Sequence, residues 1–169
     1  MRSSSWRKAV RRVGAALTSD AYHETAPHPD GGMAAAAMRL CLRDAKAKPD
    51  EVDVVVAHGT GTPLNDIAET AAIKSALGPR ARTVPVTAPK SMVGHLIGAA
   101  GALAAMVGVL AIRDGIIPPT INLDHPDPAC DLDYVPLTLR RTPVRLALAN
   151  AFGFGGQNCV AAVRAPAAR

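Results

Sequence analysis

The sequence feature that most constrains the fold is a short apolar run at residues 52–57, interrupted only by Asp53. A run this short that is dominated by valine favours a β-strand over a helix. Because the run is apolar at nearly every position, we expect both of its faces to be buried, as in a parallel sheet covered by helices. Helix-forming stretches lie on either side of it, so the pattern predicts an α/β protein.

Helical and extended patterns alternate along the rest of the chain. Helices are predicted at residues 33–47, 66–77 and 99–113, and further strands at residues 83–87, 144–149 and 159–163. We expect Asp66 and Glu69 to form a capping box at the start of the second helix, and Gly78 to end it. Several prolines between residues 118 and 128 predict a long irregular connection. The alternation predicts a helix-covered, partly parallel sheet.

The net charge of +5 is concentrated at the start of the chain. Five of the nineteen basic residues precede the first acid, Asp20, and the remaining fourteen equal the number of acids. This distribution is not typical of a nucleic-acid-binding protein, so no nucleic-acid partner is expected. We interpret residues 1–17 as a basic head, a solvated or partner-docking amphipathic segment.

Apolar runs and cysteines indicate a cytoplasmic protein. The longest apolar stretch, residues 97–112, is shorter than the roughly 18 residues of a membrane span, so no membrane partner is expected. Cys41, Cys130 and Cys159 are odd in number and lack the spacing of a metal site. They are therefore predicted to be reduced thiols, with no metal bound.

The first motif that can carry chemistry is His58-Gly59-Thr60-Gly61-Thr62-Pro63. It follows the buried strand, and catalytic groups gather at the carboxyl ends of strands in open α/β sheets. A histidine there can donate a hydrogen bond or transfer a proton, and the glycines let a substrate approach the backbone. For this motif alone, the alternative is a capped turn with a structural histidine.

Two further motifs lie at comparable turns. Residues 90–101, KSMVGHLIGAAG, place Lys90 and His95 between a predicted strand and a predicted helix. Residues 150–158, NAFGFGGQN, contain both phenylalanines of the chain. Each motif alone also fits a structural role: a capping histidine, a solvated lysine, or a glycine-rich hairpin with a phenylalanine in the core. Two histidine turns on successive strand ends favour a functional interpretation.

These segments, together with residues 18–23 (TSDAYH) and 118–123 (PPTINL), resemble the β-ketoacyl-ACP synthases of the type II elongating class. The likeness runs from about Thr18 to the C-terminus and covers about the last two fifths of such an enzyme. It implies the C-terminal half of a thiolase-like αβαβα fold, with a ketosynthase domain at residues 18–169 and a head that does not follow the family pattern. The N-terminal half with the nucleophilic cysteine would be absent.

The resemblance implies a role for each matching residue. His58 and His95 match the two histidines at the malonyl thioester carbonyl, where enolate charge develops during decarboxylation. Both rings should then be neutral donors. Lys90 matches a lysine that organises the site electrostatically, supported by Asp66 and Glu69.

Further matches concern the substrate. Phe154 matches the residue whose backbone N–H donates to the acyl-thioester oxyanion and whose ring gates the cysteine. Thr60 and Thr62 match contacts to the phosphopantetheine arm, and Thr25 maps near the acyl pocket. Ala104 departs from the family, because elongating synthases have a glutamate there that pairs with the lysine.

The function implied is decarboxylative Claisen condensation of an acyl thioester with malonyl-ACP in fatty-acid or polyketide biosynthesis. The expected partners are a separately encoded N-terminal half that brings the cysteine, in a hetero-oligomer, and acyl carrier protein. No cofactor is expected to bind directly, since the carrier protein holds the phosphopantetheine. The alternatives are a non-catalytic assembly or chain-length partner, and a truncated synthase. Retention of both histidines favours catalysis.

Overall fold

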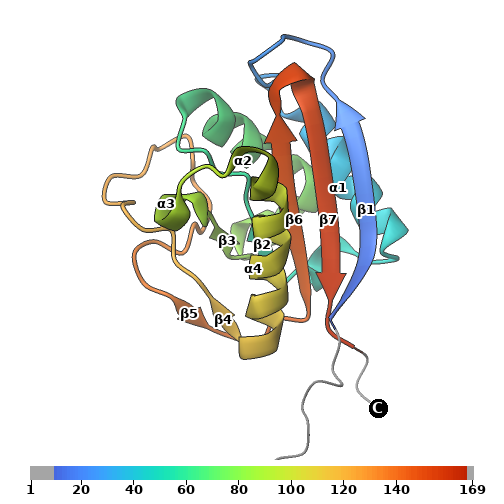
Figure 1. The fold of residues 1–169 in the computed structure, drawn as a ribbon, viewed down its shortest axis with the longest axis vertical. Helices are drawn as coiled ribbons and strands as arrows, with labels where there is room; N and C mark the ends of the chain where they lie inside the picture. The colour runs from blue at the N-terminus through green and yellow to red at the C-terminus, as the bar shows by residue number, and fades with distance from the viewer. Residues whose placement is uncertain (1–9, 167–169) are drawn as a thin grey trace, which may run out of the picture.

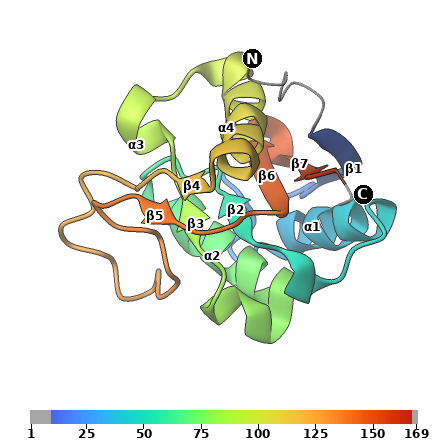
Figure 2. The same ribbon diagram turned by 90° about the horizontal axis from the view of Figure 1, so that it is seen from below.

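Helix α4 covers one face of a five-stranded mixed sheet, and α1 and α2 cover the other (Figures 1 and 2). The computed structural model describes residues 10–166. The sheet has the order β1-β7-β6-β2-β3. Its strands are β1 (Arg11–Ser19), β2 (Val54–Val56), β3 (Val86–Thr87), β6 (Leu146–Gly153) and β7 (Gln157–Arg164). The helices are α1 (Gly32–Asp44), α2 (Pro63–Leu77), α3 (Lys90–Val93) and α4 (Ala100–Asp114).

Strand β2 lies inside the sheet, parallel to both β3 and β6, and all three of its valines are buried. Strands β6 and β7 form an antiparallel hairpin, and β1 adds to β7 in antiparallel fashion. The predicted α/β class and the predicted strand pair at the C-terminus are therefore confirmed. Because β2, β3 and β6 are parallel, the segments that follow them meet at one edge of the sheet.

The larger apolar core lies between the sheet and helices α1 and α2, and smaller clusters lie under α4. Helix α4 approaches the sheet through small residues, among them Ala104 and Gly108. A Cβ atom on Gly108 would lie 3.1 Å from Val163 Cγ2 and 3.2 Å from Ala147 Cβ. Larger side chains on this face would therefore push the helix away from the sheet.

The long connection after α4 is irregular, as predicted, but it contains a two-stranded ladder that the sequence pattern did not indicate. Strands β4 (Ile116–Ile117) and β5 (Arg140–Arg141) pair in antiparallel fashion. The segment between them bonds to the main sheet, because Val86 N–H donates to Asp133 O at 2.7 Å. These short pairings fix the loop that forms one wall of the cavity described below.

The predicted capping box is wrong. Helix α2 begins at Pro63, preceded by Thr62, and no side chain caps its first turn. Glu69 points into the protein instead and accepts hydrogen bonds from the backbone of His58 and Gly59. Proline at the first helical position already removes one of the unpaired N–H groups that a cap would satisfy.

The basic head is also structured over the part that the structure describes. Strand β1 takes up Arg11–Ser19 and pairs along nearly its whole length with β7. Residues 11–17 of this head are therefore an edge strand of the sheet and not a freely solvated segment. Gly14 explains the close fit, because a Cβ there would lie 2.5 Å from Cys41 O on α1. The remaining basic residues of the head lie outside the described residues.

The apolar stretch at residues 97–112 belongs to a helical segment that is longer than its sequence pattern suggested. Residues Ile97–Asp114 form 18 residues of continuous helical structure with a mean hydropathy of 1.6, long and apolar enough by those two measures to cross a membrane. The helical stretch reaches this length by including Arg113 and Asp114, which follow the apolar run at residues 97–112. In the structure α4 packs on β2, β6 and β7, as a helix of a layered α/β fold does.

Candidate active site

Two histidines meet at the edge of the sheet where the parallel strands end. His58 follows β2, and His95 follows α3. Their ring centroids lie 5.7 Å apart, and the rings are nearly perpendicular. The two turns that the sequence analysis paired are therefore brought together by the parallel register of β2 and β3.

His58 is buried and contacted on several sides, with only 7% of the residue exposed. Lys90 Nζ lies 3.3 Å from Nδ1 of the ring and also bonds to the His58 carbonyl oxygen. The ring of Phe152 lies 5.6 Å away between centroids. Burial, together with the positive charge of Lys90 and the nearby His95, lowers the pKa of His58 to about 3. This histidine is therefore neutral at physiological pH, as expected.

His95 is exposed and held by its own turn. Its Nδ1 accepts a hydrogen bond from the backbone N–H of Ile97 at 3.0 Å. Ile97 has a φ of +49°, a left-handed conformation that β-branched residues rarely adopt. The turn that holds His95 thus contains a strained residue, and such residues cluster at functional sites.

The same contacts fix the tautomers of both rings. A backbone N–H can only donate, so Nδ1 of His95 carries the lone pair and Nε2 carries the proton. The ammonium of Lys90 likewise donates to Nδ1 of His58, which leaves the proton of that ring on Nε2. Each of the two neighbouring rings therefore has an Nε2–H donor.

Lys90 is organised by His58 and not by a carboxylate. No ion pair within 4 Å joins it to an acid among residues 10–166, although the charges of Glu69 and Asp66 act on it from further away. Burial lowers the pKa of Lys90. Ala104 packs with Val56 and Ala149 in an apolar cluster.

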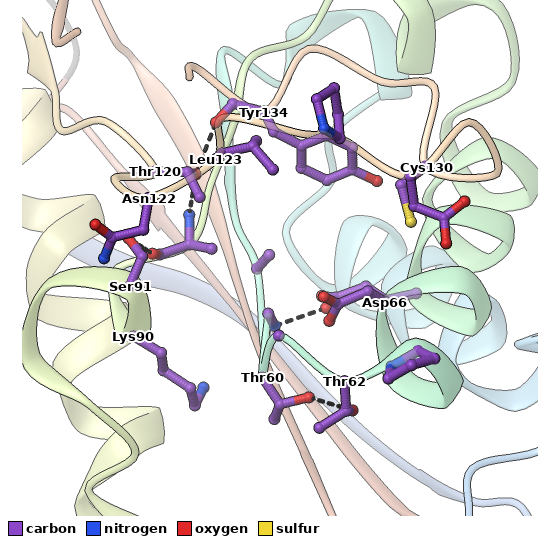
Figure 3. Close-up of a pocket in the computed structure, with 18 of the residues that line it drawn as sticks. Thr60, Thr62, Asp66, Lys90, Ser91, Thr120, Asn122, Leu123, Cys130 and Tyr134 are labelled. Carbon is purple, nitrogen blue, oxygen red and sulfur yellow. Dashed lines mark hydrogen bonds between the residues drawn. The ribbon is translucent and has the colours of Figure 1, made fainter. Parts of the chain in front are cut away.

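A cavity of about 520 Å³ opens beside these groups. Figure 3 shows Thr60 and Thr62 at its edge with their hydroxyls 2.9 Å apart, Lys90 extending into it, and Asp66 on the opposite side. The irregular connection supplies the remaining wall, including Thr120, Asn122, Leu123, Cys130 and Tyr134. No cluster of metal ligands is present among residues 10–166. The absence of a bound metal stays a prediction.

Cys130 lines this cavity, but its environment is that of an inert thiol. Burial raises its pKa, whereas a nucleophilic cysteine needs a lowered one. Cys41 is buried in α1, and its pKa is raised to about 12. All three cysteines are free, as predicted.

Phe154 and Thr25 lie on two neighbouring loops. Phe154 sits in the β6–β7 turn with 76% of the residue exposed, and Thr25 is exposed in the loop between β1 and α1. The two segments are joined, because Gly155 N–H donates to Glu24 O at 2.7 Å. On the other side of the turn, Asn158 Nδ2 donates to Asp20 Oδ1 at 2.7 Å.

Three residues of the site were not predicted. Phe152 was noted as an aromatic of the glycine-rich turn but was given no role, and it contacts His58. Ile97 carries no chemical group that would have identified it. Asn150 was detectable, because an amide at the end of the apolar run LALAN requires a buried partner.

Comparisons with known proteins agree on one family. A family model described as the β-ketoacyl synthase C-terminal domain matches residues 10–124. The 3-oxoacyl-[acyl-carrier-protein] synthase 2 of Synechocystis is 52% identical over 152 residues, which is 90% of this chain and 36% of the relative. The chain thus spans about a third of the length of such relatives.

Solved structures show the same relationship. One is a ketosynthase of a type II polyketide synthase in complex with its acyl-carrier protein and bound to a hexaketide. It superposes with a TM-score of 0.91 and 39% identity, over 94% of this chain and 39% of that one. The ishigamide ketosynthase/chain length factor superposes with a TM-score of 0.87 and 42% identity, over 92% of this chain and 38% of that one.

Proposed function

Because the chain belongs to the β-ketoacyl synthase family and has its thiolase-like α/β fold, we propose that it forms the decarboxylating half of a ketosynthase active site. The reaction is the condensation of an acyl thioester on a cysteine with malonyl-ACP. Malonyl loses CO2, and the electron pair left on its α-carbon attacks the acyl carbonyl. A new carbon–carbon bond forms, the carbon–sulfur bond to the cysteine breaks, and the product remains on the carrier protein.

The pair of Nε2–H donors carries this proposal. Loss of CO2 places enolate charge on the thioester oxygen, and donors fixed in advance stabilise such charge without reorganising. Two histidines with their Nδ1 atoms already occupied by Lys90 and by Ile97 N–H fit this need. The lowered pKa of His58 supports the assignment, because an imidazolium would be a proton donor and not only a hydrogen-bond donor.

The other site residues receive supporting roles. We propose that Thr60 and Thr62, at the edge of the cavity, contact the phosphopantetheine arm of the carrier protein. Phe154 would donate its backbone N–H to the acyl thioester and cover the cysteine, with Thr25 near the acyl chain. Lys90 would act through His58, while the negative charges of Asp66 and Glu69 act on it from a distance.

The nucleophile would come from the N-terminal portion of a synthase. Cys41 and Cys130 have raised pKa values, and the relatives extend beyond the match by nearly two thirds of their length. A separately encoded N-terminal half, in a hetero-oligomer, is the arrangement that the sequence analysis predicted. A cytoplasmic location likewise stays a prediction.

An open apolar surface beside α4 supports such a partner. Figure 1 looks onto this face, where α4 lies over part of the sheet and leaves β1 uncovered. Val163 contacts α4, so Ala161 and Cys159 share its face of β7, and Ala15 and Leu17 lie directly opposite them on β1. Leu17 is 74% exposed.

Helix α4 continues this surface with side chains that point away from the sheet. Met106 is 52% exposed and Leu110 is 37% exposed. No charged residue lies on α4 before Arg113. Exposed apolar side chains on neighbouring elements favour an interface, and a helix-bearing half of the same family is the occupant that we propose.

The catalytic proposal is tested by separating the two half-reactions. This chain is co-expressed with the N-terminal portion of the Synechocystis relative, and the complex is supplied with acyl-ACP and malonyl-ACP. In the His58→Ala and His95→Ala variants, CO2 release should fall by about 10²–10³, the effect of removing one oxyanion donor. Acyl-enzyme formation, measured by intact mass, should persist. Parental rates of condensation in both variants would show that the histidines are structural.

The interface is tested separately by charge substitution. Leu17→Glu and Met106→Glu place an acid in the open surface and should abolish co-purification with the N-terminal portion. Met33→Glu is the matched control, because Met33 is 40% exposed but lies on α1, across the sheet. Equal co-purification of all three variants would contradict the assignment of this surface.

A further inference from the structure

Glu69 is a carboxylate enclosed by hydrogen-bond donors. It lies on α2 with 3% of the residue exposed. Its Oε1 accepts from His58 N–H at 2.8 Å, and its Oε2 accepts from Gly59 N–H at 2.8 Å. Burial raises its pKa, while the hydrogen bonds lower it. The charge that holds the His58 turn thus depends on how completely the carboxylate is surrounded by donors.

Asn150 is the side chain best placed to supply such a donor. It lies on β6, 1% exposed, and its Nδ2 donates to Glu69 Oε1 at 3.0 Å. Asn65 also reaches the carboxylate, but only at 3.5 Å and on the other oxygen. Asn150 therefore supplies a second donor to Oε1, the oxygen that also accepts from the His58 N–H.

The side-chain amide of Asn150 has one hydrogen-bonded and one unpaired polar atom, and packing alone does not explain this arrangement. Its Oδ1 is buried without a hydrogen-bond partner within residues 10–166. An unpaired buried acceptor lowers stability, and an apolar side chain of the same size would avoid that cost. The benefit of the asparagine must then lie in the one bond that it makes, to Glu69.

Strand β6 contacts the His58 turn at a second point. Phe152 lies two residues after Asn150, so both side chains project from the same face of the strand. The ring of Phe152 packs against the ring of His58, and the strand then leads into the Phe154 turn. Strand β6 therefore reaches the backbone of His58 through Asn150 and Glu69, and it contacts the ring of His58 through Phe152.

We infer that Asn150 is a positioning residue, which keeps the Glu69 carboxylate ionised and aligned and thereby fixes the orientation of His58. The inference rests on the proposed function, because it assigns the benefit to the decarboxylation step. Asn150 touches neither substrate nor reacting atoms in this account. Its effect passes through Glu69 to the N–H groups of His58 and Gly59.

The test is the pH dependence of CO2 release in the assembled synthase. Asn150→Leu removes the donor, so Glu69 takes up a proton more readily, and the rate should fall further as the pH is lowered. Asn150→Asp should behave in the opposite way. Its protonated carboxyl can donate to Glu69, whereas two ionised carboxylates repel, so the rate should fall as the pH rises. We expect losses of about ten- to a hundredfold, the range caused by misplacing a group by about 1 Å.

Asn65→Ala is the matched control and should cause a smaller loss, because its bond to Glu69 is longer. Acyl-enzyme formation should be retained in all three variants. A uniform rate loss with the parental pH profile in both Asn150 variants would show a packing role and overturn the inference. Failure of the proposed function is recognised separately, by an undiminished rate in His58→Ala.

Discussion

The two histidine turns reach the same chemical state by different means. His58 is buried, and its surroundings come from four elements: the Glu69 carboxylate of α2, the Lys90 ammonium of α3, and Asn150 and Phe152 of β6 around the end of β2. His95 is exposed, and its ring is fixed by the backbone N–H of Ile97, two residues away. One donor is set by tertiary packing, and the other by a local turn.

Because of this difference, substitutions around His58 should change the stability of the fold, whereas substitutions in the His95 turn should change the orientation of that ring. Removing a tertiary contact around His58 leaves buried groups unpaired and disturbs several elements together. Changing the His95 turn affects a local conformation in which the Ile97 N–H bonds to the ring. The two turns should therefore respond differently to substitution, although both contribute to one step.

The largest effect is expected at Ile97. Ile97→Pro fixes φ near −65° and removes the N–H that defines the His95 tautomer. Condensation should fall by about 10²–10³, as in His95→Ala. Ile97→Gly is the control, since it keeps the N–H and adopts positive φ without strain, and should retain activity. A proline variant that condenses at the parental rate would show that His95 is oriented by something else.

A smaller effect is expected when the rings themselves are removed and stability is measured. His58→Ala empties a buried site and should lower the free energy of unfolding by about 2 kcal/mol. His95→Ala, at an exposed position, should change it by less than about 0.5 kcal/mol. Urea unfolding of this chain, alone or in the assembled synthase, measures both. Equal changes in the two variants would remove the distinction between the turns.

His58 should make the stability of the chain fall as the pH is lowered, whereas the raised pKa of Glu69 acts in the opposite direction. The pKa of His58 is about 3 in the folded chain, below the ordinary 6.5, so unfolded molecules bind the proton first. Its contribution is complete above about pH 6.5 and is lost towards pH 3, at up to about 1.4 kcal/mol per pH unit. Urea unfolding between about pH 7 and pH 5 should show this slope, and His58→Gln should reduce it. An unchanged slope in that variant would assign the acid sensitivity to other groups.

The sequence pattern was sufficient for the parts of the fold where local and tertiary preferences agree. The valine run became a buried parallel strand, and the helical patterns before and after it became α1, α2 and α4. The two histidine turns met because strands β2 and β3 are parallel. Strand β1 was missed because its arginines suggested a solvated segment, whereas pairing with β7 and a glycine against α1 determine its conformation.

At the site, residue types were predictable and their partners were not. Asp66 and Glu69 have the spacing of a capping box, but the buried His58 backbone offers Glu69 stronger donors than a helix end in water. Lys90 was expected to rely on acids, and its contacts are with His58. Such choices depend on which groups the fold buries together, and Asn150 joins Glu69 from 81 residues away.

The most direct test of the account is the protonation of the two rings, read by ¹⁵N NMR of histidine-labelled protein in the assembled synthase near neutral pH. We predict that both His58 and His95 are neutral, with the proton on Nε2 and the lone pair on Nδ1, and that Ile97→Pro changes only His95. A proton on Nδ1 of either ring, or an imidazolium at His58, would contradict the claim that the two turns present a matched pair of donors.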